Sequence, residues 1–335
     1  MSIIVDNFKK NKIINLTNIY NRTLYIINSN YNNEIKNTNR LRINIKQKQT
    51  MLNYIINKYQ QMKNNLKTSF DNEINKLNTI PVQTTTTITP INEKKALIIG
   101  INYIGTSSEL NGCINDAKSI EQYLREHAFT NIKMITDETS IKPTKENILN
   151  ELKTLLETSK KNDTLFIYYS GHGSYTLDRN GDELDGRDEL LVPLDFNYIK
   201  DDELKEIINS YGKVDTNLIA LFDCCNSGTA LDLKYQILEK LNYDDITENE
   251  RNSETPCNAM FISGCRDEQL SLETTINNKV QGLMTWSFLE VIRNNNNISW
   301  RNLVKKMREL LRNKSYQIPQ LSSGRLFNPD MSFNL

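Results

Sequence analysis

The chain has 335 residues with 41 basic and 41 acidic side chains, so its formal net charge is zero. A neutral chain gives no overall argument for binding nucleic acid or an anionic membrane, and we expect neither as a partner. No apolar run approaches the roughly 20 residues that cross a bilayer, and the opening MSIIVDNFKKNKII lacks the pattern of a secretory signal. Five cysteines, an odd number, then predict a reduced, intracellular and cytoplasmic protein rather than a disulfide scaffold.

Residues 1–93 form the first predicted region, which is rich in Asn, Lys, Ile and Tyr and contains no glycine. Between Leu52 and Leu77 the apolar residues recur every three or four positions, which is the spacing of one helical face. We expect a helical or coiled-coil segment whose residues 50–78 bind a partner or a second copy. The run of threonines between Pro81 and Pro90 predicts a linker.

From residue 94 onward, short apolar runs alternate with amphipathic segments. The runs predict strands near residues 94–102, 132–137, 163–170, 217–223 and 259–264, and the amphipathic segments predict helices at 113–126, 144–156, 283–293 and 300–312. This alternation indicates an α/β fold with a mostly parallel sheet and helices on both faces.

Two predicted strands end in unusual sequences. The strand at 163–170 leads into His172, which lies between two glycines, and the strand at 217–223 leads into Cys225. Functional groups in such sheets gather at the carboxyl ends of the strands. If the two strands are neighbours, the Cys and His form the minimal nucleophile and base for acyl transfer.

Each residue alone has an ordinary structural interpretation. A cysteine after a buried strand is usually a small hydrophobic residue, which is how we interpret Cys224. His127, the other histidine, ends a predicted helix, where histidine commonly interacts with the last carbonyls. It is the joint occurrence of Cys225 and His172 that favours catalysis.

The segments YYSGHG (from Tyr168) and LFDCCNSG (from Leu221) resemble the His and Cys motifs of the metacaspases, in the caspase-like clan of cysteine peptidases. Six more segments match in the same order: KKALIIGINY, NGCINDA, DGRDELLVPLD, FISGCRDEQ, GLMTWSFLE and QIPQLSSG. The resemblance runs from about Lys94 to the last residue and excludes the first 93.

The resemblance implies a caspase-like peptidase domain at 94–335, monomeric, with a large-subunit part at about 94–232, a cleavable loop at about 233–256 and a small-subunit part at about 257–335. It implies that Cys225 is the nucleophile and His172 the base and later the acid. Backbone N–H groups of Gly173 and Cys225 would hold the oxyanion.

The same resemblance implies protein or peptide substrates with Arg or Lys before the scissile bond (P1). The acidic P1 pocket would consist of Asp116, Ser170 and Asp223. The spacing agrees, because Asp223 precedes Cys225 by two residues and Ser170 precedes His172 by two, so each pair faces one side of an extended chain. Paired carboxylates would select a cationic side chain.

The resemblance also implies a Ca²⁺ cofactor, with ligands at Asp188, Asp201, Asp202 and Asp232. Clustered carboxylates repel one another until a hard divalent cation binds among them. The alternative is a solvated acidic loop.

A second acidic pattern lies close by. Asp178, Asn180, Asp182 and Glu189 occupy EF-hand positions one, three, five and twelve, but Glu183 stands where the EF-hand turn needs glycine. We therefore do not expect an EF-hand.

Self-processing is a further expectation, with Lys234, Lys240 and Arg251 as candidate cleavage points in the 233–256 loop. Asn226 replaces the histidine that usually follows the family's nucleophile. Two alternatives stay open: an inactive scaffold that retains the fold, and a peptidase of the same clan with another P1 preference.

Overall fold

The computed structural model describes residues 2–41, 43–78, 92–177, 187–224, 231–240, 243–264, 273–276, 279–295, 297–312, 314–315 and 317–335. The chain divides into two compact units, Met1–Thr89 and Pro90–Leu335. The predicted cysteine Cys225 and its neighbour Asn226 lie outside the described residues.

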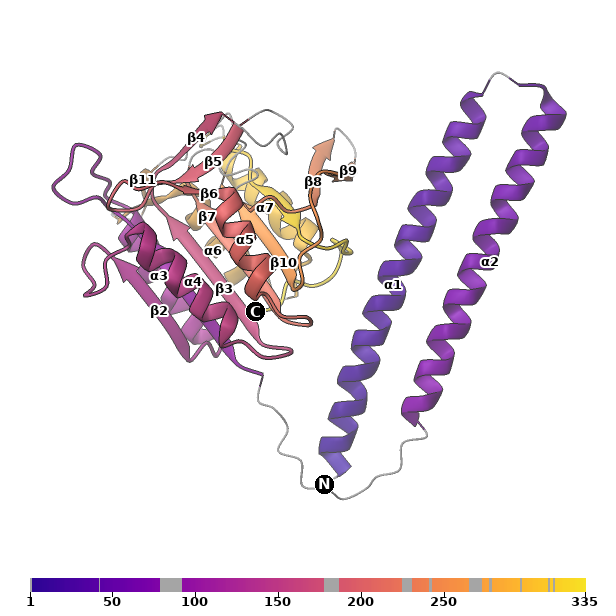
Figure 1. The fold of residues 1–335 in the computed structure, drawn as a ribbon, viewed down its shortest axis with the longest axis horizontal. Helices are drawn as coiled ribbons and strands as arrows, with labels where there is room; N and C mark the ends of the chain where they lie inside the picture. The colour runs from indigo at the N-terminus through magenta and orange to yellow at the C-terminus, as the bar shows by residue number, and fades with distance from the viewer. Residues whose placement is uncertain are drawn as a thin grey trace. The chain divides into compact units, whose positions relative to one another are not determined.

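The first unit is a hairpin of two long helices, α1 (Ser2–Arg40) and α2 (Ile45–Asn78) (Figure 1). Ile55 and Tyr59 of α2 are buried against Ile27 of α1. The apolar stripe predicted on residues 50–78 therefore packs on a helix of its own chain, and self-association through it stays a prediction. None of the described helices is both long and apolar enough to cross a bilayer.

The second unit is built on an eight-stranded sheet with strand order β2-β1-β3-β7-β10-β13-β8-β9. The first five strands in that order are parallel, and the remaining three pair antiparallel. The strands are β1 (Lys94–Gly100), β2 (Asn131–Thr136), β3 (Thr164–Ser170), β7 (Asn217–Asp223), β8 (Tyr235–Lys240), β9 (Tyr243–Glu248), β10 (Asn258–Ser263) and β13 (Gln320–Ser323).

Helices cover both faces of this sheet (Figure 1). One face packs against α4 (Lys145–Glu157) and α5 (Asp201–Tyr211), and the other packs against α3 (Cys113–Glu126), α6 (Leu283–Arg293) and α7 (Trp300–Leu311). The central strands read as continuous apolar runs because helices cover them on both sides. The predicted fold class is confirmed.

Two small antiparallel sheets accompany the main one. The first contains β4 (Gly173–Leu177), β5 (Arg187–Leu191) and β6 (Ile199–Lys200), and the second contains β11 (Glu273–Ile276) and β12 (Lys279–Gly282). The first follows His172 directly, and the second leads into α6. Both extend from the carboxyl side of the parallel strands, where they frame the candidate site.

The expected loop at 233–256 is wrong in its central part, because β8 and β9 form a hairpin that extends the main sheet. Tyr235 and Ile237 are buried, whereas Gln236 between them is half-buried, which is the period-two alternation of a β-strand. The high content of Asp and Glu concealed this pattern in the sequence. Only residues 249–257 connect β9 to β10 without regular structure.

Candidate functional site

The carboxyl ends of β3 and β7 lie side by side, as the sequence predicted. The two strands are parallel, and Ser170 pairs in register with Asp223. His172 follows the first of these residues by two positions, and Cys225 follows the second by two positions in the sequence. The pairing of the neighbouring strands thus brings the two predicted motifs to one edge of the sheet.

The imidazole of His172 has a defined hydrogen-bond partner on a loop. Its Nε2 lies 2.8 Å from the backbone carbonyl oxygen of Ser108. Because a carbonyl oxygen can only accept, Nε2 carries the proton, and in the neutral ring Nδ1 is left as an acceptor. The geometry therefore selects the tautomer that can remove a proton through Nδ1.

Tyr103 fixes the position of this histidine. The two rings pack with their centroids 4.7 Å apart, and the backbone N–H of His172 donates to the Tyr103 hydroxyl at 2.8 Å. That hydroxyl donates in turn to the carbonyl of Val192 at 2.6 Å. Tyr103 has a φ of 53°, a left-handed backbone that non-glycine residues rarely adopt and that occurs often at functional sites.

Asp116 and Asp223, the two predicted pocket carboxylates, are both buried. Asp116 lies in the first turn of α3 and accepts a hydrogen bond from the backbone N–H of Gly282 at 2.7 Å. Asp223 accepts two from Thr285, one from its backbone N–H at 3.0 Å and one from its hydroxyl at 2.7 Å. The start of α6 thus supplies donors to both carboxylates, and its dipole favours negative charge there.

Gly282 lies between the two carboxylates, and its lack of a side chain lets both approach its backbone closely. A Cβ atom on this residue would lie 2.2 Å from Oδ2 of Asp223 and 3.0 Å from Oδ2 of Asp116. Both acidic groups therefore approach the same backbone position, which admits only glycine without displacement. The structure groups the predicted pair into one buried anionic site.

A buried tyrosine completes this site. The hydroxyls of Tyr168 and Thr285 are 2.7 Å apart. Because Thr285 gives its proton to the Asp223 carboxylate, Tyr168 must donate to Thr285. Burial first, and then the charges of Asp116 and Asp223, raise the pKa of Tyr168 well above its ordinary value. Ser170 is also buried and follows Tyr168 by two residues on β3, so both side chains lie on the same face of the strand.

We expect Thr285→Val to lower kcat/KM for peptide substrates by about ten- to a hundredfold, since a hydrogen bond to a charged group contributes about 1.5–3 kcal/mol. Thr285→Ser keeps the hydroxyl and should restore most of the loss. Melting temperatures of both variants provide the control. A fall in Tm for both variants with unchanged kcat/KM would assign Thr285 a purely structural role.

Three of the four predicted metal ligands lie together. Asp188 of β5 and the first two residues of α5, Asp201 and Asp202, offer carboxylate oxygens within 4.8 Å of one another. Burial, and next the charge of Asp232, raises the pKa of Asp201 to about 7. Asp232 is itself buried and has a left-handed φ of 44°. The fourth predicted ligand thus acts electrostatically on Asp201, although its carboxylate is not among the three grouped ones.

Glu189 joins this acidic group, although the sequence did not predict it as a ligand. Its backbone N–H donates to Oδ2 of Asp201 at 2.6 Å, and its side chain is buried. The ammonium of Lys200 pairs with Asp188. Buried oxygen donors with one cationic partner fit the donor set of a hard divalent cation such as Ca²⁺. Residues 178–186 of the EF-hand-like pattern lie outside the described residues.

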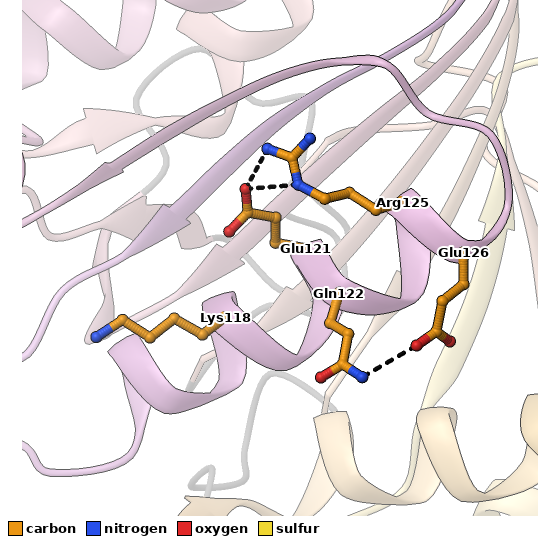
Figure 2. A pocket seen from close by; sticks show the side chains of 5 residues that line it. All are labelled: Lys118, Glu121, Gln122, Arg125 and Glu126. Atoms are coloured by element: carbon orange, nitrogen blue, oxygen red, sulfur yellow. Dashed lines mark hydrogen bonds and ion pairs between the residues drawn. The ribbon is translucent and has the colours of Figure 1, made fainter.

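A surface hollow on α3 is separate from these groups. Figure 2 shows its five lining side chains, which are Lys118, Glu121, Gln122, Arg125 and Glu126. They come from one helix, and two pairs four residues apart bond to each other, Glu121 with Arg125 and Gln122 with Glu126. None of the predicted site residues lines it, so the hollow reflects the ordinary polar face of an exposed helix.

Sequence reasoning missed the groups that support the site. Thr285 and Gly282 lie in the segment GLMTWSFLE, whose resemblance was noted without a role for either residue. The Ser108 carbonyl is a backbone group on a loop, and no side-chain motif signals it. His127 and Cys224 match their structural interpretations, since His127 caps α3 and Cys224 is buried in the core.

Comparison with known proteins agrees with this architecture. The model of the "Metacaspase, peptidase C14 domain" matches residues 94–234. Metacaspase-1 of Schizosaccharomyces pombe is 36% identical over 284 residues, covering 69% of this chain and 67% of that protein. Metacaspase-1 of Candida albicans is 35% identical over 299 residues, covering 72% and 67%.

A solved structure, that of a Geobacter sulfurreducens protein, shares the fold with a TM-score of 0.54 at 22% identity, covering 72% of this chain and 97% of that one. The family match and the curated relatives decide the class of enzyme. The chain belongs to the metacaspase family and is a cysteine-type endopeptidase that acts on protein substrates.

Proposed function

We propose that this peptidase cleaves after Arg or Lys through a dyad of Cys225 and His172. The observation that carries the proposal is the buried pair Asp116 and Asp223, gathered around Gly282 at the strand edge that also holds His172. A buried anionic site binds a cationic side chain far better than a neutral or acidic one, because a neutral or acidic side chain would leave the buried carboxylates without a compensating charge.

The chemistry follows from the tautomer of His172. Nδ1 takes the proton of the Cys225 thiol, and the thiolate attacks the carbonyl carbon of the scissile peptide. The tetrahedral oxyanion is held by backbone N–H groups of Gly173 and Cys225. His172 returns the proton to the leaving amine, and water then hydrolyses the acyl-enzyme with His172 again as base.

The hydrogen bond from Nε2 to Ser108 serves this cycle in both charge states. In the neutral ring it holds the productive tautomer, and in the imidazolium it gives one of the two N–H groups an acceptor. Tyr103 limits rotation of the ring. The loop around Ser108 thus takes the orienting role that a carboxylate has in a three-residue hydrolase site.

A panel of fluorogenic peptides that differ only at P1 tests the proposal. Turnover with Arg and Lys, and none with Asp, Asn or Leu, is the expected result. Turnover of Asp or Asn peptides would favour the other P1 preference, and no turnover of any peptide would favour the inactive scaffold.

Calcium is the second part of the proposal. Asp188, Asp201, Asp202 and Asp232 would hold it, and a bound cation would compensate the charge of these carboxylates and of Glu189. The ion pair between Lys200 and Asp188 would weaken in response, because the cation and the ammonium would compete for the same carboxylate. The link to activity would run through β5 and α5, which carry three of the four ligands.

We expect millimolar Ca²⁺ to raise both the Tm and the peptidase activity of the protein, and EDTA to reverse both effects. Asp201→Asn should remove the Ca²⁺-dependent shift in Tm, since it deletes a central ligand. Asp215→Asn, a surface carboxylate paired with Lys161, is the matched control. An unchanged Tm shift in Asp201→Asn would exclude this cluster as the site.

Self-cleavage completes the proposed function, with Lys234, Lys240 and Arg251 as its candidate positions. Lys234 immediately precedes β8 and pairs with Glu248, and Lys240 ends β8. Arg251 is exposed within the irregular connection between β9 and β10. Proteases cut exposed loop segments most readily, so Arg251 is the position we favour.

A further inference from the structure

The turn of the helical hairpin has a distinctive surface. We define the hairpin tip as residues 36–48, which include the end of α1 and the start of α2. Leu41, Ile43 and Ile45 are exposed there, at 43%, 37% and 88% of their full area. Single exposed aliphatic residues are common on proteins. Three at alternate positions of one turn form an apolar patch at the extremity of the hairpin.

Basic residues surround this patch. Lys36, Arg40 and Lys46 are exposed, and the ammonium of Lys48 donates to the carbonyl of Asn39 at 3.0 Å. The sequence contains no acidic residue from position 35 to position 70. The tip is therefore positively charged around its aliphatic centre, without nearby carboxylates in sequence to balance it.

The neutral charge of the whole chain conceals this segregation. Residues 1–89 contain thirteen Lys or Arg and four Asp or Glu, whereas residues 90–335 contain twenty-eight and thirty-seven. A basic unit is thus joined to an acidic one. The partner that suits the tip must be anionic and must accept aliphatic side chains.

We propose that the hairpin tip docks on an anionic lipid surface. The aliphatic side chains would enter the boundary between headgroups and acyl chains, and the basic side chains would contact the anionic headgroups. Each basic residue near such a surface strengthens binding by about fivefold, and the apolar patch adds to this. The contact would be interfacial, because the aliphatic and basic side chains lie together in one short turn.

Other partners fit the tip less well. Residues 36–48 contain no aromatic side chain on which a nucleic-acid base could stack. A second copy of the tip would bring like charges together. The aliphatic character of the patch and the sign of the surrounding charge both favour lipid.

The shape of the hairpin suits this role. At 1.5 Å per residue, the 34 residues of α2 span about 50 Å. The tip lies at the end of the hairpin opposite Asn78, from which the chain continues (Figure 1). Docking would therefore hold the membrane contact about 50 Å from the point where the chain leaves the hairpin.

Co-sedimentation of the full-length protein with liposomes tests the proposal. We expect binding to vesicles of phosphatidylcholine with about 30% phosphatidylserine, and at least tenfold weaker binding to phosphatidylcholine alone. EDTA in the buffer prevents calcium from bridging protein and lipid. Raising the salt concentration should weaken binding, because screening acts on exposed charges.

Two tip variants separate the contributions. The serine variant keeps the charge and removes the aliphatic patch, and it carries Leu41→Ser, Ile43→Ser and Ile45→Ser. The glutamine variant keeps the aliphatic patch and removes basic charge, and it carries Lys36→Gln, Arg40→Gln and Lys46→Gln. Each variant should lower the affinity for anionic vesicles at least tenfold. The control, Ile56→Ser/Lys67→Gln, changes one exposed aliphatic and one exposed basic residue elsewhere on α2, and should bind like the original chain. Helicity by circular dichroism confirms that each hairpin is folded.

Three results would overturn the proposal. The first is equal binding to neutral and anionic vesicles, or none to either. The second is wild-type binding by both tip variants. The third is a result that assigns the tip to another partner. Tighter binding of single-stranded RNA than of anionic vesicles, with the serine variant unaffected, would assign it to nucleic acid. A dimer in solution that the serine variant dissociates would assign it to a second copy.

Discussion

His172→Ala is expected to lower kcat/KM for an Arg-terminated peptide by at least about a thousandfold, as removal of a catalytic nucleophile or base does in other hydrolases. The physical reason is the tautomer that Ser108 selects. Nδ1 is the acceptor that activates the thiol, and Nε2 donates to a backbone carbonyl. Steady-state kinetics at saturating Ca²⁺ provide the measurement.

The chain supplies a matched control for this variant, because its only other histidine is His127. Nδ1 of His127 lies 2.8 Å from the carbonyl of Tyr123 at the end of α3, so His127→Ala should affect stability alone. Comparable losses of activity in the two variants would contradict the role given to His172. So would a His172→Ala enzyme that keeps more than about a tenth of its activity.

The second large effect concerns Asp223→Asn and Asp116→Asn. Each should lower kcat/KM for Arg and Lys peptides by at least about thirtyfold, since losing one partner of a buried charge pair costs about 2–5 kcal/mol. The loss should fall on cationic substrates, so the ratio of Arg to Leu turnover should drop in the same proportion. The P1 panel described above measures this ratio.

The two carboxylates accept hydrogen bonds from different groups. Asp223 accepts from the backbone and the hydroxyl of Thr285, whereas Asp116 accepts from Gly282. Glu138→Gln, an exposed carboxylate paired with Lys118, should leave the ratio unchanged. A uniform fall for all P1 residues in both Asp variants would show that they hold the fold and do not select the substrate.

Much of the fold could be predicted from the sequence because the central strands and their helices have clear periodicity. β7 and α6 begin and end at the predicted residues. The strands that were missed are short, such as β4, or lie next to the edge strand of the main sheet, such as β8, and their side chains alternate only over a few positions. Short alternations give weak signals, and pairing with a neighbour decides them.

The candidate site was predictable where side chains carry the chemistry. Strand order brings the ends of β3 and β7 together, so His172 and Asp223 could be placed at one edge from sequence alone. The Ser108 carbonyl and the N–H of Gly282 could not, because they are backbone groups whose orientation depends on tertiary structure. Glu189 occupies position twelve of the EF-hand-like pattern that was not expected to bind a cation, and its contact with Asp201 appears only once β5 lies beside α5.

Whole-chain composition was the least informative quantity. A net charge of zero argued against a membrane partner, yet the charge is divided between a basic hairpin and an acidic peptidase unit. Net charge sums over units that act separately. The charge of the hairpin alone, thirteen basic and four acidic residues in positions 1–89, is what favours an anionic partner.

Labelling with an active-site probe tests the central claim most directly. The probe is a peptide with P1 Arg and an acyloxymethyl ketone that alkylates a catalytic thiolate, and the readout is intact-mass and peptide-mapping mass spectrometry. The account predicts one adduct per chain, located on Cys225, absent with a P1 Asp probe and strongly reduced in Asp223→Asn. Labelling of a different cysteine, or equal labelling by the Arg and Asp probes, would contradict it.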